Sequence, residues 1–273
     1  MIRVLSLGAG VQSTTMALMA AHGEIGPMPD CAIFADTQGE PKAVYTHLAQ
    51  LRERLPFPVH IVTAGDLWAS ATRVRRTRDG QRTYIGTAIP VHLEEGLRRG
   101  IGQRHCTRDF KIVPIERKVR ELAGLPRVLK RHGVIAEMWI GISADEAQRM
   151  KPSRRSWIKA RWPLIERDMD RLDCIDWMRG HGYPEPPRSA CTFCPFRDDA
   201  SWLALTPGEF SDAVAKEREL QDAYARASQY RAVPYLHEQR VPLDQVALDH
   251  TPTRVKPRQR NLFGNECEGM CGL

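Results

Sequence analysis

The sequence contains no apolar run that approaches the roughly 18 residues needed to cross a membrane as a helix. It also lacks the charged and then apolar start of a signal peptide, because it opens with the strand-like IRVLSLG. Internal repeats, low-complexity tracts and the phosphate-binding signature GxxxxGK[ST] are absent as well. We therefore expect a soluble protein of the cytoplasm with no membrane partner.

The length of 273 residues suits one large domain with appendages, or two modest domains, and can bury a core without disulfides. Seven cysteines are present. In a reducing compartment cysteines serve metal binding or thiol chemistry more often than structural disulfides. Two of them, Cys31 and Cys174, lie in an apolar strand and an apolar helix and are expected to be core residues.

Positive charge is concentrated in one part of the chain. Lys and Arg number 40 against 33 Asp and Glu, and residues 73–131 hold 16 basic and 6 acidic side chains, a surplus that exceeds the +7 of the whole chain. Such clustering favours an anionic ligand such as a nucleic acid or a nucleotide, the alternative being an ordinary solvated helix face. Residues 73–82, with five arginines, are predicted to form a mobile loop.

Short apolar runs alternate with amphipathic stretches, which predicts a doubly wound, mostly parallel α/β sheet with helices on both faces. We expect strands at 2–7, 31–36, 59–64 and 134–142. The expected helices span 13–22, 42–55, a stretch within 111–124, 170–180 and 207–231, followed by an extended proline-rich segment.

Gly8 and Gly10 lie between the first strand and a helix whose first turn offers Ser13, Thr14 and Thr15. Free backbone N–H groups at a helix start attract phosphate, although many strand-to-helix turns carry two glycines for steric reasons alone. The second strand ends in the segment Asp36-Thr37-Gln38-Gly39-Glu40-Pro41, which places a carboxylate at the carboxyl edge of the sheet, where ligands bind in open α/β sheets.

These motifs occur in a recognisable order. SLGAGVQST and ADTQGEP are followed by HCTRDFKIVP, GISADEAQR, WPLIE and ACTFCPF. In this order they resemble the PP-loop ATP pyrophosphatase superfamily (adenine nucleotide alpha hydrolase-like), and especially its phosphoadenosine phosphosulfate reductase-like family. The resemblance covers about residues 1–200 and implies a Rossmann-like nucleotide-binding domain that includes the CxxC loop. Residues 201–273 would then form a helical and extended region with a cysteine-containing tail.

The resemblance implies that ATP and Mg²⁺ bind at the glycine loop and the neighbouring strand ends. GISADEAQR places two acids and an arginine after an apolar strand, where they could hold Mg²⁺ and phosphate, or could simply open a helix. Asp36 and Lys111 are the expected catalytic residues in this part of the chain. The expected nucleotide-binding residues are Ser6, Gly8, Gly10, Gln12, Ser13, Thr14, Asp36, Thr37, Gly141, Asp145, Glu146 and Arg149.

Cys191 and Cys194 form a CxxC, a spacing that can grip one metal or cluster, form a redox pair or arise by chance. Cys106 has Arg104, His105 and Arg108 around it, and positive charge favours the thiolate. Resemblance to cluster-bearing members of the superfamily implies a 4Fe-4S cluster on Cys106, Cys191 and Cys194, while zinc would use the same residues.

The tail ECEGMCGL supplies Cys267 and Cys271. It is similar to the tail of sulfonucleotide reductases, in which a cysteine is the nucleophile, although the histidine of that tail is missing here. This match implies that Cys267 is the reactive thiol and that Cys271 is the fourth metal ligand; the reverse assignment stays open.

Three functions are consistent with these features. The first is an ATP-dependent, AMP- and pyrophosphate-forming sulfurtransferase that adenylates an acceptor, expected to be a nucleobase in a nucleic acid, and uses a sulfur donor. The second is a phosphoadenylyl or adenylyl sulfate reductase that uses a carboxyl-terminal thiolate and a thioredoxin-like reductant. The third is a non-catalytic, metal-stapled nucleic-acid-binding protein whose glycine loop is only a turn. The local surplus of arginines favours the first.

Overall fold

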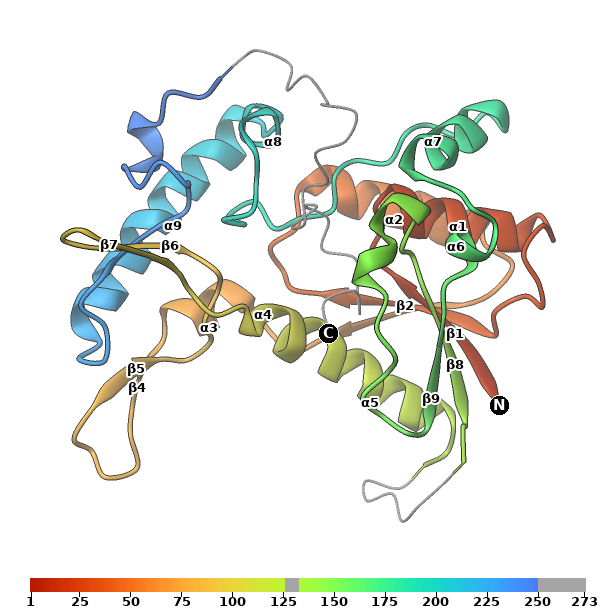
Figure 1. Cartoon of the computed structure of the whole chain (residues 1–273), viewed down its shortest axis with the longest axis horizontal. Helices are drawn as coiled ribbons and strands as arrows, with labels where there is room; N and C mark the ends of the chain where they lie inside the picture. The colour runs from red at the N-terminus through yellow and green to blue at the C-terminus, as the bar shows by residue number, and fades with distance from the viewer. Residues whose placement is uncertain (126–132, 250–273) are drawn as a thin grey trace.

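The computed structural model describes residues 1–125 and 133–249 (Figure 1). Its centre is a five-stranded parallel sheet in the order β3-β2-β1-β8-β9. The strands are β1 (Ile2–Leu7), β2 (Cys31–Asp36), β3 (Val59–Thr63), β8 (Ala136–Ile140) and β9 (Ile158–Arg161). Nearly all residues of β1, β2 and β8 are buried, which is why these strands read as continuous apolar runs. The predicted doubly wound α/β class is therefore confirmed.

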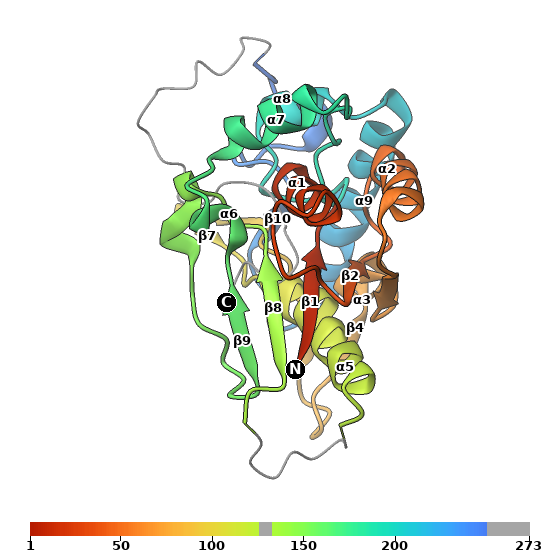
Figure 2. The same cartoon turned by 90° about the vertical axis from the view of Figure 1, so that its right-hand side faces the viewer.

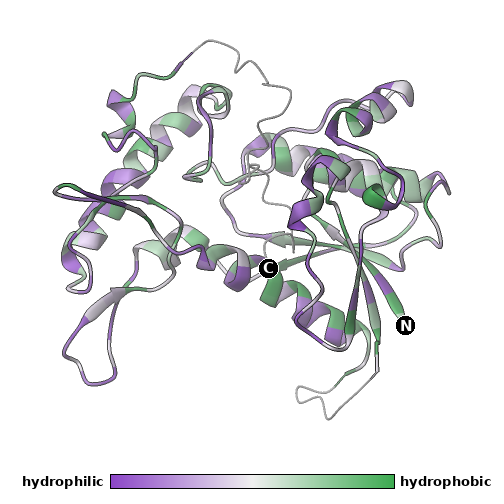
Figure 3. Ribbon diagram, viewed as in Figure 1, coloured by the Kyte–Doolittle hydropathy of each residue, from purple (hydrophilic) through white to green (hydrophobic). Residues whose placement is uncertain are grey.

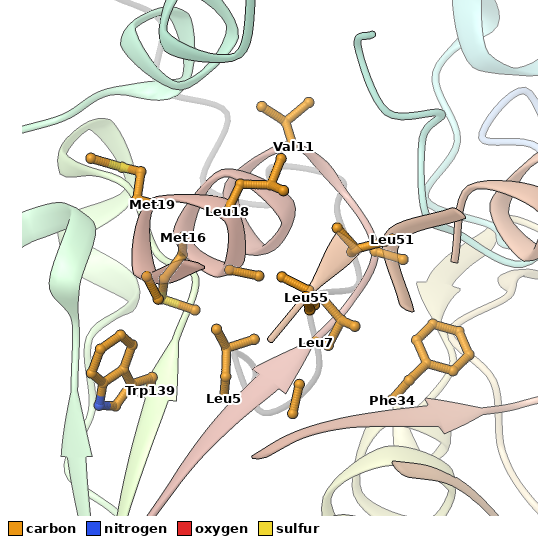
Figure 4. Close-up of a cluster of buried hydrophobic side chains, with 14 of the residues drawn as sticks. Leu5, Leu7, Val11, Met16, Leu18, Met19, Phe34, Leu51, Leu55 and Trp139 are labelled. Carbon is orange, nitrogen blue, oxygen red and sulfur yellow. The ribbon is translucent and has the colours of Figure 1, made fainter. Parts of the chain in front are cut away.

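Helices cover both faces of this sheet. One face packs against α1 (Val11–Ala21), α2 (Lys42–Arg54), α6 (Pro163–Glu166) and α7 (Arg171–Gly180). Figure 4 shows part of this core, in which Leu5 and Leu7 of β1 lie beneath α1 and Trp139 of β8 faces Met16. The other face packs against α5 (Val113–Leu122) and the preceding π-helical turn η1 (Arg108–Ile112). Strand alternation explains the division, because neighbouring residues such as Val4 and Leu5 point to opposite faces.

A second hydrophobic cluster joins residues 67–110 to residues 191–248. It contains α3 (Leu67–Thr72), α4 (His105–Thr107), α8 (Asp199–Leu203), α9 (Pro207–Arg226) and η3 (Leu243–Gln245). Two antiparallel strand pairs lie beside α9 and α3. In the first, β4 (Val74–Arg76) pairs with β5 (Thr83–Ile85). In the second, β6 (His92–Glu95) pairs with β7 (Arg98–Ile101), and β10 (Val233–Tyr235) pairs with the other edge of β6. In Figure 3 the tip of the β4–β5 hairpin is hydrophilic.

The arginine-rich segment 73–82 differs from the predicted loop in part: residues 74–76 form strand β4, and residues 77–82 form the loop of the β4–β5 hairpin. Its tip is closed by hydrogen bonds from Thr77 N to Arg82 O (2.8 Å) and from Gly80 N to Thr77 O (2.9 Å). Val74 and Ile85 pack on the second hydrophobic cluster. Two apolar side chains and a well-bonded turn are enough to order the pair, which composition alone did not reveal.

Helix ends also differ from the predictions. α1 begins at Val11, two residues early, with Gly10 as its N-cap. α9 ends at Arg226 and not at residue 231. The reason is a tertiary contact, since Ser228 leaves the helix to exchange hydrogen bonds with Thr83: Ser228 N donates to Thr83 Oγ1 (2.7 Å) and Thr83 N to Ser228 Oγ (2.9 Å). Among the described residues, no helix combines the length and apolarity that a membrane span requires.

Candidate functional site at the carboxyl edge of the sheet

The carboxyl ends of β1, β2 and β8 are neighbours in the sheet, since Leu7 is in register with Phe34 and Ser6 with Ile140. The chain segments that leave these ends carry the expected nucleotide residues. Gly8 to Gly10 follow β1, Thr37 follows β2, and the 3₁₀ turn η2 (Ala144–Arg149) follows β8. Figure 2 shows these strands running in parallel toward α1 and α7. The sequence motifs therefore meet at one edge of the sheet.

The glycine loop turns sharply between β1 and α1. Ala9 adopts a left-handed conformation (φ 59°), and Gly8 N donates to Ser13 Oγ at 3.2 Å. Thr14 Oγ1 lies 3.0 Å from His47 Nε2 on α2. In the described part of the chain no side chain caps the first turn of α1. The hydroxyls of Ser13 and Thr14 thus shape the loop, and the backbone N–H groups of the helix start remain the donors suited to phosphate.

Gln12 connects the glycine loop to two other elements. Its Nε2 donates to Ser143 Oγ (3.4 Å) and Glu146 Oε2 (3.5 Å), and its Oε1 accepts a hydrogen bond from Arg171 Nη1 (3.2 Å). Glu146 also forms an ion pair with Arg149. A buried amide therefore holds η2 and the start of α7 against the loop. Asp145 is exposed next to this network, Gly141 is buried at the end of β8, and Ser6 is buried within β1.

Asp36, at the end of β2, is held by two hydrogen bonds. Its Oδ1 accepts from Tyr45 Oη (2.8 Å) and from Gln38 N (2.7 Å). Burial, and next the hydrogen bond to Asp36, raise the pKa of Tyr45, so the phenol stays protonated and keeps donating. The carboxylate is thus fixed in orientation through Oδ1, and Oδ2 could take a ligand such as Mg²⁺ or a ribose hydroxyl.

Cys106, Cys191 and Cys194 line one pocket, although 85 residues separate the first from the second in the sequence. Cys106 comes from α4, and the other two from the loop that precedes α8. The space enclosed by the lining is about 440 Å³, open solvent at its mouth included. Cys267 and Cys271 lie outside the described residues. Cys31 and Cys174 are buried in the core, as predicted.

The CxxC loop is rigidly held. Cys194 N donates to Cys191 O (2.9 Å), which closes a tight turn that presents both thiols. The guanidinium of Arg197 is buried and donates to three backbone carbonyls: Cys191 O (3.0 Å), Ala190 O (2.7 Å) and Ser201 O (3.0 Å). These bonds hold the backbone of the loop from the side opposite the pocket.

A buried ion pair lies beside the thiols. Lys111 Nζ is 3.4 Å from Glu40 Oε1, with 6% and 0% of the two side chains exposed, and Ser189 Oγ donates to Glu40 Oε2 (3.4 Å). Burial, followed by the charge of Glu40, raises the pKa of the Cys191 thiol, and Lys111 opposes this shift. Lys111 therefore contributes positive charge to the pocket, and its amine is engaged by Glu40.

The cysteine pocket and the expected nucleotide edge share residues. Thr37 lines the pocket, and its Oγ1 lies 3.3 Å from Cys191 Sγ. The backbones of the two segments are also hydrogen-bonded, since Thr192 N donates to Gly39 O (2.8 Å). The segment that ends β2 thus carries Asp36 on one side and supports the CxxC loop on the other.

Sequence reasoning missed Glu40, Arg171 and Arg197 as parts of this site. Glu40 belongs to the quoted ADTQGEP segment, so its motif could have suggested it. Arg197 follows the CxxC by three residues, and an arginine after such a loop is a donor for its carbonyls. Arg171 gave no local signal, because its partner Gln12 lies 159 residues away.

The expected anion-binding surface is exposed in the structure. The two hairpins, the segment leading to α4 and the first residue of η1 present solvent-exposed arginines at positions 73, 75, 76, 78, 82, 98, 99, 104 and 108. Two of them form exposed ion pairs, Arg99 with Glu94 (3.2 Å) and Arg108 with Asp109 (2.8 Å). Arg104 lies over the ring of Phe196, which lines the cysteine pocket (5.3 Å to the ring centre). Basic side chains therefore extend from the hairpins to the edge of that pocket.

Comparison with known proteins gives a likeness to a solved structure and none to a family model or curated sequence. Among solved structures, the chain is similar to a phosphoadenylyl-sulfate (PAPS) reductase from Candida auris in complex with phosphate, at 12% identity and a TM-score of 0.41 over 68% of this chain and 75% of that one. The likeness concerns the fold, and this chain's own side chains must indicate substrate and cofactor.

Proposed function

We propose that this chain is an enzyme that binds an adenine nucleotide at the glycine loop and carries out sulfur chemistry at an adjacent thiolate-ligated metal centre. The observation that carries the proposal is the contact between Thr37 and Cys191, because it joins the nucleotide edge to the three-cysteine pocket. In a non-catalytic nucleic-acid-binding protein, in which the metal only stabilises the fold and the glycine loop is only a turn, the glycine-loop edge and the cysteine pocket would not need to be adjacent.

The donor set fits a metal centre. Three cysteines line one pocket, and Cys271 or Cys267 would supply a fourth thiolate from outside the described residues. Burial raises the pKa of Cys191, so the free thiol stays protonated, whereas a bound cation would favour the thiolate. A 4Fe-4S cluster suits such a set, and zinc is the alternative. When bound, the group supplies a polarising metal beside the nucleotide.

In the proposed reaction a nucleobase oxygen attacks the α-phosphate of ATP, and pyrophosphate leaves. The terminal sulfur of a persulfide on Cys267 then attacks the base carbon, and AMP leaves with the oxygen. A sulfane-sulfur donor must load Cys267, and a thiol must afterwards cleave the remaining S–S bond. Backbone N–H groups at the start of α1, with Arg149 and a Mg²⁺ ion on Asp145 or Glu146, would stabilise the phosphate charge.

The exposed arginines favour a nucleic-acid acceptor. Eight of them lie on the hairpins and the segment that leads to Cys106, and Arg108 lies just after it. A free nucleotide needs only a few cations, while a nucleic acid offers a phosphate at each residue along a strand. The arrangement would guide a polynucleotide across the mouth of the cysteine pocket, where Arg104 lies.

A second candidate is reduction of adenylyl or phosphoadenylyl sulfate, the activity by which the similar solved structure is named. The tail sequence ECEGMC favours it. Here the thiolate of Cys267 attacks the sulfate sulfur, the nucleotide leaves, and a thioredoxin-like dithiol then displaces sulfite from the cysteine.

One pair of assays separates the two reactions. In the first assay, the anaerobically purified chain is given ATP with or without RNA or DNA, and the release of pyrophosphate and AMP is measured. In the second, it is given phosphoadenylyl sulfate and reduced thioredoxin, and the release of sulfite is measured. Nucleic-acid-dependent pyrophosphate release supports sulfur transfer, and sulfite supports the reductase. Release of neither product would refute both.

A further inference from the structure

We propose that His22, Glu24 and His181 form a binding site for a divalent transition-metal ion, with Zn²⁺ as the favoured ion. One ligand atom from each of these side chains lies within 4.8 Å of the other two. Two imidazoles and one carboxylate are a donor set that zinc commonly takes, with water in the fourth position. The site lies beyond the last residue of α1, whereas the glycine loop lies before its first, so the proposed nucleotide and cysteine chemistry does not involve these residues.

Two helix ends create favourable electrostatics at this point. His22 is the C-cap residue of α1 and His181 is the C-cap residue of α7, and the two helices pack against each other (Figures 1 and 2). The last carbonyl groups of a helix carry partial negative charge, which stabilises a cation nearby. A cation between His22 and His181 would therefore benefit from both helix dipoles as well as from the charge of Glu24.

Trp177 orients two of the three ligands. Its Nε1 donates to Glu24 Oε2 (2.9 Å), which leaves Oε1 directed at His181 Nε2, 3.5 Å away. Its backbone carbonyl accepts from His181 Nδ1 (2.8 Å), and the two rings stack with centres 4.0 Å apart. Because a carbonyl only accepts, Nδ1 carries the hydrogen and Nε2 of the neutral ring offers a lone pair. Metal-binding histidines are usually oriented by such a bond.

His22 is positioned from the other side. Its Nε2 lies 2.8 Å from the hydroxyl of Tyr183, and its ring packs edge-on against His181 (5.2 Å between centres) and Trp177 (5.6 Å). Each of the three candidate ligands thus contacts Trp177 or Tyr183, although the site is open to solvent. Such orienting contacts are typical of a preorganised binding site and are not required where surface side chains are close by chance.

The spacing favours a bridging ion over a direct ion pair. A charge-assisted hydrogen bond between imidazolium and carboxylate is about 2.7–2.9 Å long, shorter than the 3.5 Å between His181 and Glu24. In a tetrahedral zinc site with bonds of about 2.0–2.1 Å, neighbouring ligand atoms lie roughly 3.3 Å apart. Small rotations of partly exposed side chains would bring all three atoms to that spacing.

The consequence would be a cross-link between α1 and α7. The opposite end of α7 carries Arg171, which bonds Gln12 beside the glycine loop. An ion at the far end would stabilise the packing of α7 on α1 and, through it, the position of Arg171. Because the ion would bind the folded chain and not the unfolded one, it would raise the melting temperature in proportion to the logarithm of its concentration.

The test uses the full-length chain without a histidine tag. Zinc content after equilibrium dialysis against buffered Zn²⁺ would be compared among wild type, His22→Ala, His181→Ala and Glu24→Gln, with His60→Ala as the control histidine elsewhere on the surface. We expect the three ligand variants to bind about one equivalent less than wild type and to show a zinc-dependent rise in Tm that is smaller by several degrees. His60→Ala should retain both. The cysteine pocket is the same in all five proteins, so the difference isolates the proposed site.

Glu24→Gln keeps the shape of the side chain and an oxygen for Trp177, so it decides the question if either alanine variant fails to fold. Co²⁺ provides an independent readout, because this site would add d–d absorption without a thiolate charge-transfer band, and Glu24→Gln would remove that addition. Equal zinc content and equal zinc-dependent Tm shifts in wild type and Glu24→Gln would overturn the proposal. The proposed nucleotide and cysteine chemistry would be unaffected by that outcome.

Discussion

At the scale of single residues, Arg197 is the support of the cysteine loop. It is 7% exposed and donates to the carbonyls of Ala190, Cys191 and Ser201. We expect Arg197→Met to lower the free energy of unfolding by on the order of 3 kcal/mol, because three buried carbonyls lose their donors. Urea unfolding measures the change. Arg99→Met, which removes an exposed ion pair, should change stability by no more than about 0.5 kcal/mol, and equal effects of the two substitutions would contradict the role of Arg197.

His47 gives a pH-dependent prediction. Burial, and next the charge of Arg54, lower its pKa below the ordinary 6.5, while its ring bonds Thr14. Below pH 6.5 the unfolded chain therefore binds a proton that the folded chain does not, so stability falls as the pH drops toward the lowered pKa. Urea unfolding of wild type and His47→Gln at about pH 7.5 and pH 5.5 should show a smaller loss for the variant. Identical losses would mean that His47 does not titrate in this range.

At the scale of elements, the segment after β2 and the CxxC loop are packed without spare room. A Cβ on Gly39 would lie 2.8 Å from Phe193 Cε1 and 3.4 Å from Cys191 Sγ, and Phe193 is itself packed on Trp68 (4.7 Å between ring centres). Gly39→Ala should cost about 1–3 kcal/mol and reduce the metal content of the purified chain. Gly208→Ala is the control, since nothing lies within 4 Å of its Cβ position; it should not destabilise the chain and should leave the metal content unchanged. A normal metal content in Gly39→Ala would show that the two segments are not coupled.

Four of the five strands of the central sheet could be predicted, and β1, β2 and β8 were the easiest, because their burial leaves continuous apolar runs, as in CAIFAD. The edge strand β9 (Ile158–Arg161) was missed, since its sequence IKAR is short and half polar. Ordered motifs also predicted which segments reach the carboxyl edge. The hairpin at Arg75 could not be predicted in this way, since its order comes from two apolar side chains and a turn. Pairs such as Lys111 with Glu40 join residues 71 positions apart, and periodicity carries no information about such pairs.

At the scale of the whole molecule, the arginine-bearing hairpins should determine binding to polyanions. Reversing two exposed charges on β4, as in Arg75→Glu with Arg76→Glu, should weaken RNA or DNA binding. The slope of log affinity against log salt should fall by up to about 0.7–0.9 for each phosphate that these arginines no longer neutralise. Fluorescence anisotropy across a salt series measures both effects. Arg52→Glu with Arg54→Glu on α2 is the matched control and should have little effect, because these residues lie outside the hairpins. Equal reductions in both pairs would indicate a response to net charge alone.

The central claim is that one edge of the sheet holds both a nucleotide and a thiolate-ligated metal. A crystal structure of the anaerobically purified chain with an ATP analogue, with anomalous data collected at the iron and zinc edges, tests it most directly. We predict phosphate density at the N–H groups that open α1 and an anomalous peak between Cys106, Cys191 and Cys194. A nucleotide bound away from the glycine loop, or the three sulfurs without any metal, would contradict it.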